Sequence, residues 1–153
     1  MVEIIAYNNQ YKEDFRKMNL EWLDAYNLTE SHDLEVLDDP QGTIIDRGGC
    51  IFLAIENNTI AGTAALMKAG ADGFELAKMT VDKTFRGRGI SKLLMNHCLQ
   101  EARRRQAKRV LLFSNHQLET ALRLYRQFGF VDIPVEDSPF ATADVKMELV
   151  LSS

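Results

Sequence analysis

Two arginines and two glycines alternate over residues 86–89, within the stretch TVDKTFRGRGISKLL of residues 80–94. At this point an apolar run gives way to the amphipathic spacing of a helix. The N–H groups that begin a helix bind anions, glycine lets the backbone approach closely, and arginine donates paired hydrogen bonds to phosphate oxygens. Taken alone, the pattern leaves two interpretations open, a pyrophosphate site and a tight turn with solvated arginines.

Two common phosphate-binding motifs are excluded by the flanking residues. The dinucleotide-binding fingerprint needs a third glycine and an acid at the end of the next strand. Position 92 is Lys instead, and the next apolar run ends in Ser114-Asn115. The P-loop pattern GxxxxGK followed by Ser or Thr is absent from the chain. A third kind of phosphate site is needed.

Residues 86–91, Arg-Gly-Arg-Gly-Ile-Ser, resemble the acetyl-CoA motif of the GNAT N-acetyltransferase superfamily, Gln/Arg-x-x-Gly-x-Gly/Ala. Ser91 departs from the last position, and because serine is small we expect crowding rather than loss of binding. Downstream, Asn115 and the stretch ALRLYRQFGF of residues 121–130 resemble the second signature of the family, N…AxxLYxxxGF. The chain is identified as a small member of this superfamily, with no substrate assigned by the motifs.

The resemblance implies a mixed α+β fold, with a central, mostly antiparallel sheet that splays at the CoA site and is flanked by helices. Residues 1–153 would form one such domain. The pantetheine arm of acetyl-CoA would pair with the strand end at residues 79–81, and the diphosphate would rest on the glycine turn. The implied acetyl-CoA-binding residues are Met79, Thr80, Val81, Arg86, Gly87, Arg88, Gly89, Ile90, Ser91, Lys92, Asn115 and Tyr125.

The resemblance also implies a catalytic acid. The departing CoA thiolate needs a proton, and the family places a tyrosine there, which here is Tyr125. Tyr125 lies on the apolar stripe of its predicted helix, where a core role is the plain alternative. The thioester oxygen needs a donor as charge develops on it, and a backbone N–H near Met79 would supply one.

The acceptor amine must lose a proton, so acetyl transfer needs a base. Glu75 is the candidate, because a carboxylate early in an apolar strand would have its pKa raised by burial. A position facing water at the strand end is an equal alternative. Lys78 would reach Glu75 only across a bulge, since odd and even strand positions face opposite ways, or it would steer an acidic substrate. Glu30, Asp33 and His116 are weaker candidates for contacting the acceptor, and His97 is expected in the core.

We therefore expect an acetyl-CoA-dependent N-acetyltransferase that acts by direct transfer in a ternary complex. The acceptor would be a primary amine of a small or amino-acid-like molecule. Two alternatives remain: a protein N-terminal or lysine acetyltransferase, and a non-catalytic acyl-CoA-binding regulatory module.

The predicted elements that position these residues begin with a helix whose apolar positions recur from Tyr11 to Tyr26. Residues 27–49 are polar and acidic and suit an irregular loop over a pocket, with a short helix near residues 33–37. Strands are expected at 50–56, 59–67 and 74–81, the first two joined by an Asn57-Asn58 turn. They are followed by a helix to residue 106, a strand at 109–114, a helix at 118–128 closed by Gly129, and a strand at 145–151.

The composition limits the classes of partner that the protein is expected to bind. A formal net charge of −4 argues against non-specific nucleic-acid binding, and no apolar stretch is long enough to span a membrane. Cys50 and Cys98 are too few for a disulfide framework or a zinc site, so no metal is expected. A cytoplasmic protein is the default expectation. The oligomeric state stays open, with a homodimer the arrangement common in the superfamily.

Overall fold

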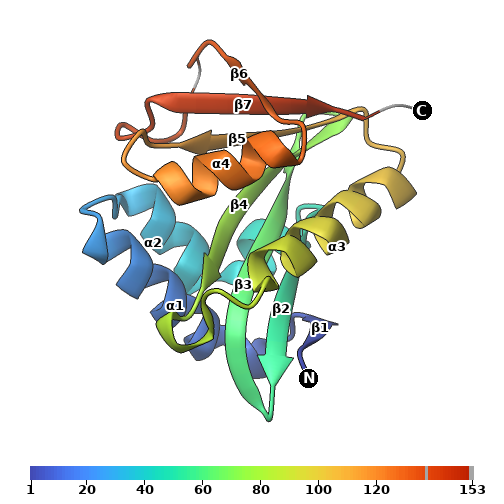
Figure 1. The fold of residues 1–153 in the computed structure, drawn as a ribbon. Helices are drawn as coiled ribbons and strands as arrows, with labels where there is room; N and C mark the ends of the chain where they lie inside the picture. Colours follow the sequence, from blue (N-terminus) through green and yellow to red (C-terminus); the bar gives the residue numbers. More distant parts are fainter. Residues whose placement is uncertain (137, 152–153) are drawn as a thin grey trace.

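The computed structural model describes residues 1–136 and 138–151. Residue 137 and residues 152 and 153, all within the expected domain of residues 1–153, lie outside the described residues. Within the described part, seven strands form one sheet in the order β1-β2-β3-β4-β5-β7-β6 (Figure 1). The strands are β1 (Glu3–Ala6), β2 (Cys50–Glu56), β3 (Thr59–Ala69), β4 (Gly73–Val81), β5 (Arg109–Ser114), β6 (Val131–Ile133) and β7 (Val145–Val150).

Helices cover both faces of the sheet (Figure 1). In that view α3 (Ile90–Arg104) and α4 (Glu119–Gln127) lie in front of the sheet, and α1 (Lys12–Ala25) and α2 (Ser31–Asp38) lie behind it. Short helical turns occupy Asn9–Tyr11, Gln41–Ile45 and Lys83–Phe85. The predicted mixed α+β class is therefore confirmed. None of the helices in the described ranges combines the length and the apolar character of a membrane span.

The core consists of two layers, one on each face of the sheet. The layer under α3 includes Leu94, Met95 and Met147, each fully buried. The layer under α1 and α2 includes Phe15 and Leu37, also fully buried. Both faces of the middle strands therefore need apolar residues, which explains why their sequences read as continuous apolar runs rather than as alternating ones.

A glycine sets how closely α3 approaches the sheet. Gly62 on β3 pairs with Val81 at the end of β4. A Cβ atom at Gly62 would lie only 3.1 Å from a methyl group of Leu94 and 3.3 Å from one of Ile90. Because no side chain intervenes, the N-terminal turn of α3 packs directly beside the strand end that precedes it.

Strands β4 and β5 form the parallel pair of the sheet, and their pairing is short. Register runs from Gly73 opposite Arg109 to Glu75 opposite Leu111. Beyond Glu75 the two strands diverge, although each continues for several residues. The V-shaped opening that the family resemblance implied between residues 79–81 and the strand at 109–114 is present, and Glu75 lies at its apex.

One expected feature is wrong in its main character. Residues 27–49 were expected to be largely irregular, yet most of them are helical and packed against the sheet. Val36, Leu37 and Ile44 from this segment are buried at 2% exposure or less. Because polar residues separate these few buried apolar residues, their helical spacing is hard to recognise in the sequence.

Candidate functional site

The glycine turn exposes backbone donors at the start of α3. Gly87 and Gly89 have φ angles of +79° and +76°, which glycine adopts without the cost that other residues incur. The Leu93 N–H donates to the Gly89 carbonyl at 3.2 Å. The N–H groups of residues 90–92 precede this first helical bond, so they are available to an anion. A Cβ atom at either glycine would meet nothing within 4 Å, so the turn borders open space.

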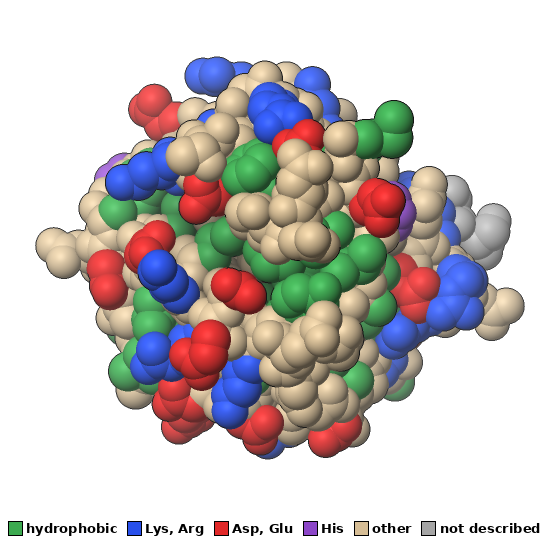
Figure 2. Space-filling view, turned by 90° about the horizontal axis from the view of Figure 1, so that it is seen from below, with side chains coloured by type: hydrophobic (Ala, Val, Ile, Leu, Met, Phe, Trp, Pro, Cys, Tyr) green, Lys and Arg blue, Asp and Glu red, His purple; other side chains and the backbone are tan. Residues whose placement is uncertain are grey.

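This open space is a cleft of about 620 Å³ between the end of β4, the glycine turn and α4. Seen from below the view of Figure 1, hydrophobic side chains gather near the centre of the face, with acidic and basic side chains interspersed around them (Figure 2). Ten of the predicted acetyl-CoA-binding residues line the cleft: Met79, Thr80, Val81, Arg86, Gly87, Gly89, Ile90, Ser91, Lys92 and Tyr125.

The remaining two predicted cofactor residues are engaged elsewhere. Nη2 of Arg88 lies 2.8 Å from Oε2 of Glu56, at the β2–β3 turn. The Asn115 side-chain amide donates to the Thr142 carbonyl at 2.8 Å, and its oxygen accepts from the Gln117 N–H at 3.0 Å. Both side chains therefore hold loops in place, and neither lines the cleft, although Asn115 lines a smaller cavity beside it.

Sequence reasoning missed several residues that line the cleft. Trp22 reaches it from α1, Phe85 from the turn before α3, and Arg123 from α4. Trp22 belongs to the apolar stripe of its helix, and Arg123 lies within the second family signature. No sequence signal separates them from ordinary packing and surface residues, because their roles depend on how distant elements meet.

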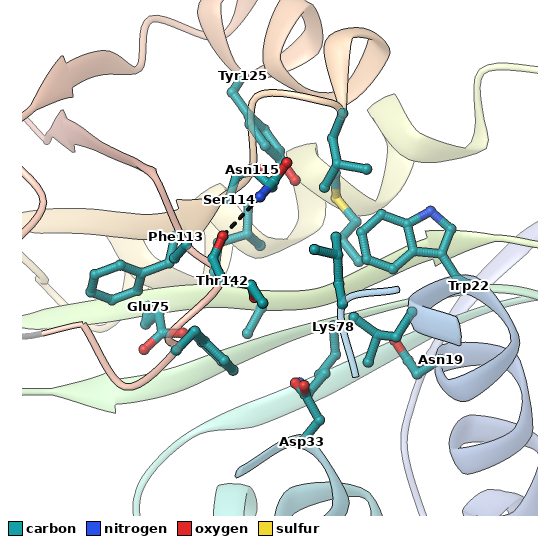
Figure 3. A pocket seen from close by; sticks show the side chains of 18 residues that line it. Asn19, Trp22, Asp33, Glu75, Lys78, Phe113, Ser114, Asn115, Tyr125 and Thr142 are labelled. Carbon is teal, nitrogen blue, oxygen red and sulfur yellow. Dashed lines mark hydrogen bonds and ion pairs between the residues drawn. The ribbon is translucent and has the colours of Figure 1, made fainter. Parts of the chain in front are cut away.

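A second, smaller cavity of about 100 Å³ adjoins the cleft (Figure 3). It lies where α1, α2, β4, β5 and residues 140–143 come together. The cavity and the cleft share four lining residues, Trp22, Met79, Leu118 and Tyr125. The site thus has two compartments that meet where β4 and β5 diverge, beside the predicted catalytic tyrosine.

Glu75 lines the smaller cavity and is half-buried. Burial raises the pKa of its carboxyl from the ordinary value of 4.5 to about 7, although the positive charges of Lys78 and Lys146 act in the opposite direction. The structure therefore favours the buried alternative for Glu75 over a strand end that faces water. A carboxyl with this pKa exchanges protons readily near neutral pH.

A β-bulge brings Lys78 into the same cavity. Register shifts between Thr63 and Ala65, and Lys78 opposite them has a φ angle of +53°, in the left-handed region. The bulge reverses the alternation of side chains along β4, so Lys78 and Glu75 both line the cavity. Lys78 nevertheless forms its ion pair with Asp33 of α2, and both side chains are buried, at 6% and 2% exposure.

A chain of buried hydrogen bonds holds this bulge. The Asn19 side-chain amide donates to the Thr63 hydroxyl at 3.1 Å, and that hydroxyl donates to the Lys78 carbonyl at 2.7 Å. Asn19 and Thr63 are at most 1% exposed. A non-glycine residue in the left-handed region costs about 1 kcal/mol or more, and these bonds offset that strain.

Tyr125 extends from α4 into the region where the two compartments meet (Figure 3). Burial raises the pKa of its hydroxyl to about 12. The phenol therefore keeps its proton at neutral pH and is suited to act as a donor rather than a base. Its ring also packs against Phe130, with 6.1 Å between the ring centroids, so the expected core contact and the access to the cavity coexist.

Residues 140–143 close one side of the cavity. The Glu30 carboxylate accepts from the N–H groups of Ala141 and Thr142, at 2.8 and 2.9 Å. His116 is exposed and pairs with Asp144, so it helps to hold this segment in place. Glu30, a weaker candidate for binding the acceptor, acts here as an anchor.

His97 differs from the expectation of a core histidine. It is half-buried, with its ring edge against Phe52 at 5.9 Å between centroids and its Nδ1 3.2 Å from the Leu93 carbonyl. Leu93, placed on the same inward stripe by the spacing, is 41% exposed. The stripe that faces the sheet is narrower than the sequence indicated.

The sequence model of the Acetyltransferase (GNAT) family matches residues 11–130. The chain belongs to this family. A crystal structure of a GNAT-family acetyltransferase from Staphylococcus aureus Mu50 superposes with a TM-score of 0.92, at 25% identity, over 99% of this chain and 100% of that one. The PaiA N-acetyltransferase of Thermoplasma acidophilum, solved in complex with coenzyme A, shares the fold with a TM-score of 0.79, at 15% identity, over 99% of both chains.

Among curated proteins, the N-acetylaspartate synthetase of Rattus norvegicus is 29% identical over 123 residues. The matched region is 80% of this chain and 40% of the relative. The chain thus spans about two fifths of the length of that curated protein.

Proposed function

We propose that the protein transfers the acetyl group of acetyl-CoA to the primary amine of a small molecule, directly and within a ternary complex. The observation that carries the proposal is the junction of the two compartments. A large cleft with anion-binding backbone donors meets a smaller cavity at Met79 and Tyr125. Such a junction brings the acetyl donor and the amine acceptor together. Holding two reactants close and in the reacting orientation supplies much of the rate enhancement of a transfer reaction.

The cleft fits acetyl-CoA. The positive φ angles and the open space at Gly87 and Gly89 leave room for a diphosphate against the first turn of α3. Arg86, Lys92 and Arg123 line the same cleft and would add positive charge, whereas Arg88 would brace the turn through Glu56. Beyond Glu75, the β4 edge that faces β5 has no strand paired to it among residues 1–136 and 138–151, which suits the amides of a pantetheine arm. Acetyl-CoA, when bound, supplies the acetyl group as an activated thioester.

The side chains of the cavity suit the proton transfers. Glu75 accepts the proton of the attacking amine, because burial has brought its pKa close to neutrality. Glu75 lies four residues from Met79 along β4, roughly 13 Å of extended chain, so the proton passes through water in the cavity. A water needs about 10–15 Å³, and the cavity of about 100 Å³ accommodates a small acceptor with ordered water beside it.

The remaining charges develop next to Met79 and Tyr125. A backbone N–H near Met79 donates to the thioester oxygen as it becomes negative. The Tyr125 hydroxyl, which keeps its proton at neutral pH, donates that proton to the departing thiolate and regains one from solvent. The reaction then needs no acyl-enzyme. Cys98 is fully buried in the layer under α3 and Cys50 packs against it, so both lie away from the cavity.

The volume of the smaller cavity, about 100 Å³, supports a small acceptor over a protein. Thr142 lines this cavity, and its N–H donates to the Glu30 carboxylate at 2.9 Å, so this part of the wall is held in place. The rat relative is named for the synthesis of an acetylated amino acid, which is also a small molecule.

Thiol release from acetyl-CoA with a panel of small amines tests the proposal. We expect turnover by the wild-type protein and at least a tenfold lower kcat in Tyr125→Phe, with acetyl-CoA affinity changed less than threefold. Tyr11→Phe, in the turn before α1, is the matched control and should retain wild-type kcat. Tight acetyl-CoA binding with no thiol released by any amine would instead establish a non-catalytic acyl-CoA-binding module.

A further inference from the structure

The cavity that would receive the acceptor contains a cation that is already neutralised. Lys78 is the cationic side chain among the residues lining the cavity in the described part of the chain, and its ammonium is paired with Asp33. The same ammonium lies 5.4 Å from the centroid of the Phe140 ring. Both partners are almost fully withdrawn from water, so the pair persists without competition from solvent.

A second carboxyl faces the same space. Glu75 lines the cavity and, when ionised, gives it a net negative charge beside the neutral Asp33–Lys78 pair. Lys146, the other cation that acts on Glu75, lies outside the lining. Its ammonium donates to the Glu136 carbonyl at 3.3 Å and lies 5.2 Å from the centroid of the Phe113 ring. An acceptor carboxylate in the cavity would therefore meet no uncommitted positive charge among the described lining residues.

Most of the rest of the lining is apolar or aromatic, and its uncharged polar side chains are those of Asn19, Ser114, Asn115 and Thr142. Trp22, Leu28, Phe113, Leu118 and Phe140 surround the charged groups. In Figure 3, Trp22 lies at one end of the cavity and Phe113 at the other, with Tyr125 between them on the α4 side. Because the lining is largely apolar, it favours a ligand with an apolar body, and a buried carboxylate without a cationic partner is strongly disfavoured there.

Resting on the proposed function, we infer that the acceptor is a small primary amine with an apolar body and no carboxylate. This class excludes free amino acids, and it separates the protein from the N-acetylaspartate synthetases, whose named product carries two carboxyl groups. The Asp33–Lys78 pair enforces the exclusion, because Lys78 is the lysine among the described lining residues that a substrate carboxylate would use, and Asp33 already neutralises it. The amine end points to Met79 and Tyr125, and the apolar body fills the space toward Phe113 and Phe140.

Matched acceptors test this inference on the wild-type protein. L-Leucinamide carries an uncharged carboxamide where L-leucine carries a carboxylate, and isopentylamine lacks the group altogether. With rates expressed per neutral amine, we expect kcat/KM for leucinamide and isopentylamine to exceed that for leucine at least a hundredfold, and aspartate to be inert. Leucine or aspartate as the better acceptor would overturn the inference and leave the proposed transfer intact. No acetylation of any acceptor would overturn the transfer itself and the inference with it.

A charge variant tests the role of the pair. Asp33→Asn removes the counter-charge of Lys78 and keeps a side-chain oxygen that can accept from the Glu30 N–H at the start of α2. We expect the ratio of leucine to leucinamide kcat/KM to rise at least tenfold. In the double variant Asp33→Asn with Lys78→Met the free cation is gone, and the ratio should return to within threefold of wild type. A ratio that does not change in the single variant would refute this role of the pair. Circular dichroism and acetyl-CoA titration verify that each variant is folded.

Discussion

Glu75→Gln is expected to stabilise the protein at alkaline pH while it removes activity. Folding raises the pKa of Glu75 from 4.5 to about 7, so the native protein binds more protons than the unfolded chain between these values. Stability is therefore lost as the pH rises through this window. The rise of about 2.5 pKa units is worth about 3 kcal/mol at full ionisation, since each unit corresponds to about 1.4 kcal/mol. Glutamine has nearly the same shape and never ionises, so it avoids this cost.

The size of the effect depends on pH in a defined way. At pH 5 Glu75 is protonated in the native protein and the cost is about 1 kcal/mol, whereas at pH 8 it is about 3 kcal/mol. The free energy of unfolding of Glu75→Gln, relative to wild type, should thus increase by about 2.5 kcal/mol from pH 5 to pH 8. Urea unfolding at several pH values measures it. Glu35→Gln, at an exposed position of α2, provides the baseline for the same chemical change.

The same variant tests the role of the carboxylate in the reaction. Wild-type kcat/KM should rise with pH up to about 7 as Glu75 ionises, and Glu75→Gln should lose at least a hundredfold in kcat with acetyl-CoA affinity nearly unchanged. A stability difference that is flat between pH 5 and pH 8 would show that Glu75 is not held in a desolvated site. Full activity of the variant would remove it as the base.

Two further substitutions probe the elements that frame the site. Gly89→Val should weaken CoA binding more than tenfold in calorimetry, because the valine side chain would occupy the open space at the start of α3. Gly70→Val is the control: Gly70 lies in the β3–β4 turn with a φ angle of +71°, so the substitution causes equal backbone strain and should leave CoA affinity unchanged. Thr63→Val removes the hydroxyl that donates to the Lys78 carbonyl, so it should lower the free energy of unfolding by about 1–3 kcal/mol, measured by thermal unfolding, and should also lower kcat. Thr59→Val, at an exposed position, is the control and should change neither quantity.

Much of the fold follows from the sequence because several elements have sharp local boundaries. Residues 50–56 and 109–114 are strands with the predicted bounds, since an apolar run ends at a turn or a charged residue on each side. The Asn57-Asn58 turn is also present, with φ angles of 50° and 62° at the two residues. Positive φ values are tolerated by asparagine, which makes this a local signal.

The parts of the site that sequence could not supply depend on distant contacts. The Asp33–Lys78 pair joins residues that are 45 positions apart, and it forms only because a bulge turns Lys78 to the cavity side of β4. Strict alternation assigns Lys78 and Glu75 to opposite faces of the sheet, and no residue type at the bulge indicates in the sequence that the alternation along β4 reverses there. The hydrogen bond from Asn19 to Thr63 likewise cannot be predicted from the spacing of residues, since it joins α1 to β3 in the middle of the sheet.

Transfer of a labelled acetyl group tests the central claim most directly. The wild-type protein is incubated with ¹³C-acetyl-CoA and leucinamide, and mass spectrometry follows the labelled amide product and the intact protein while the free CoA thiol is titrated. The structure predicts one labelled N-acetyl product for each CoA released, with the mass of the protein unchanged. Thiol release without a labelled product, or label retained on the protein, would contradict direct transfer between the two compartments.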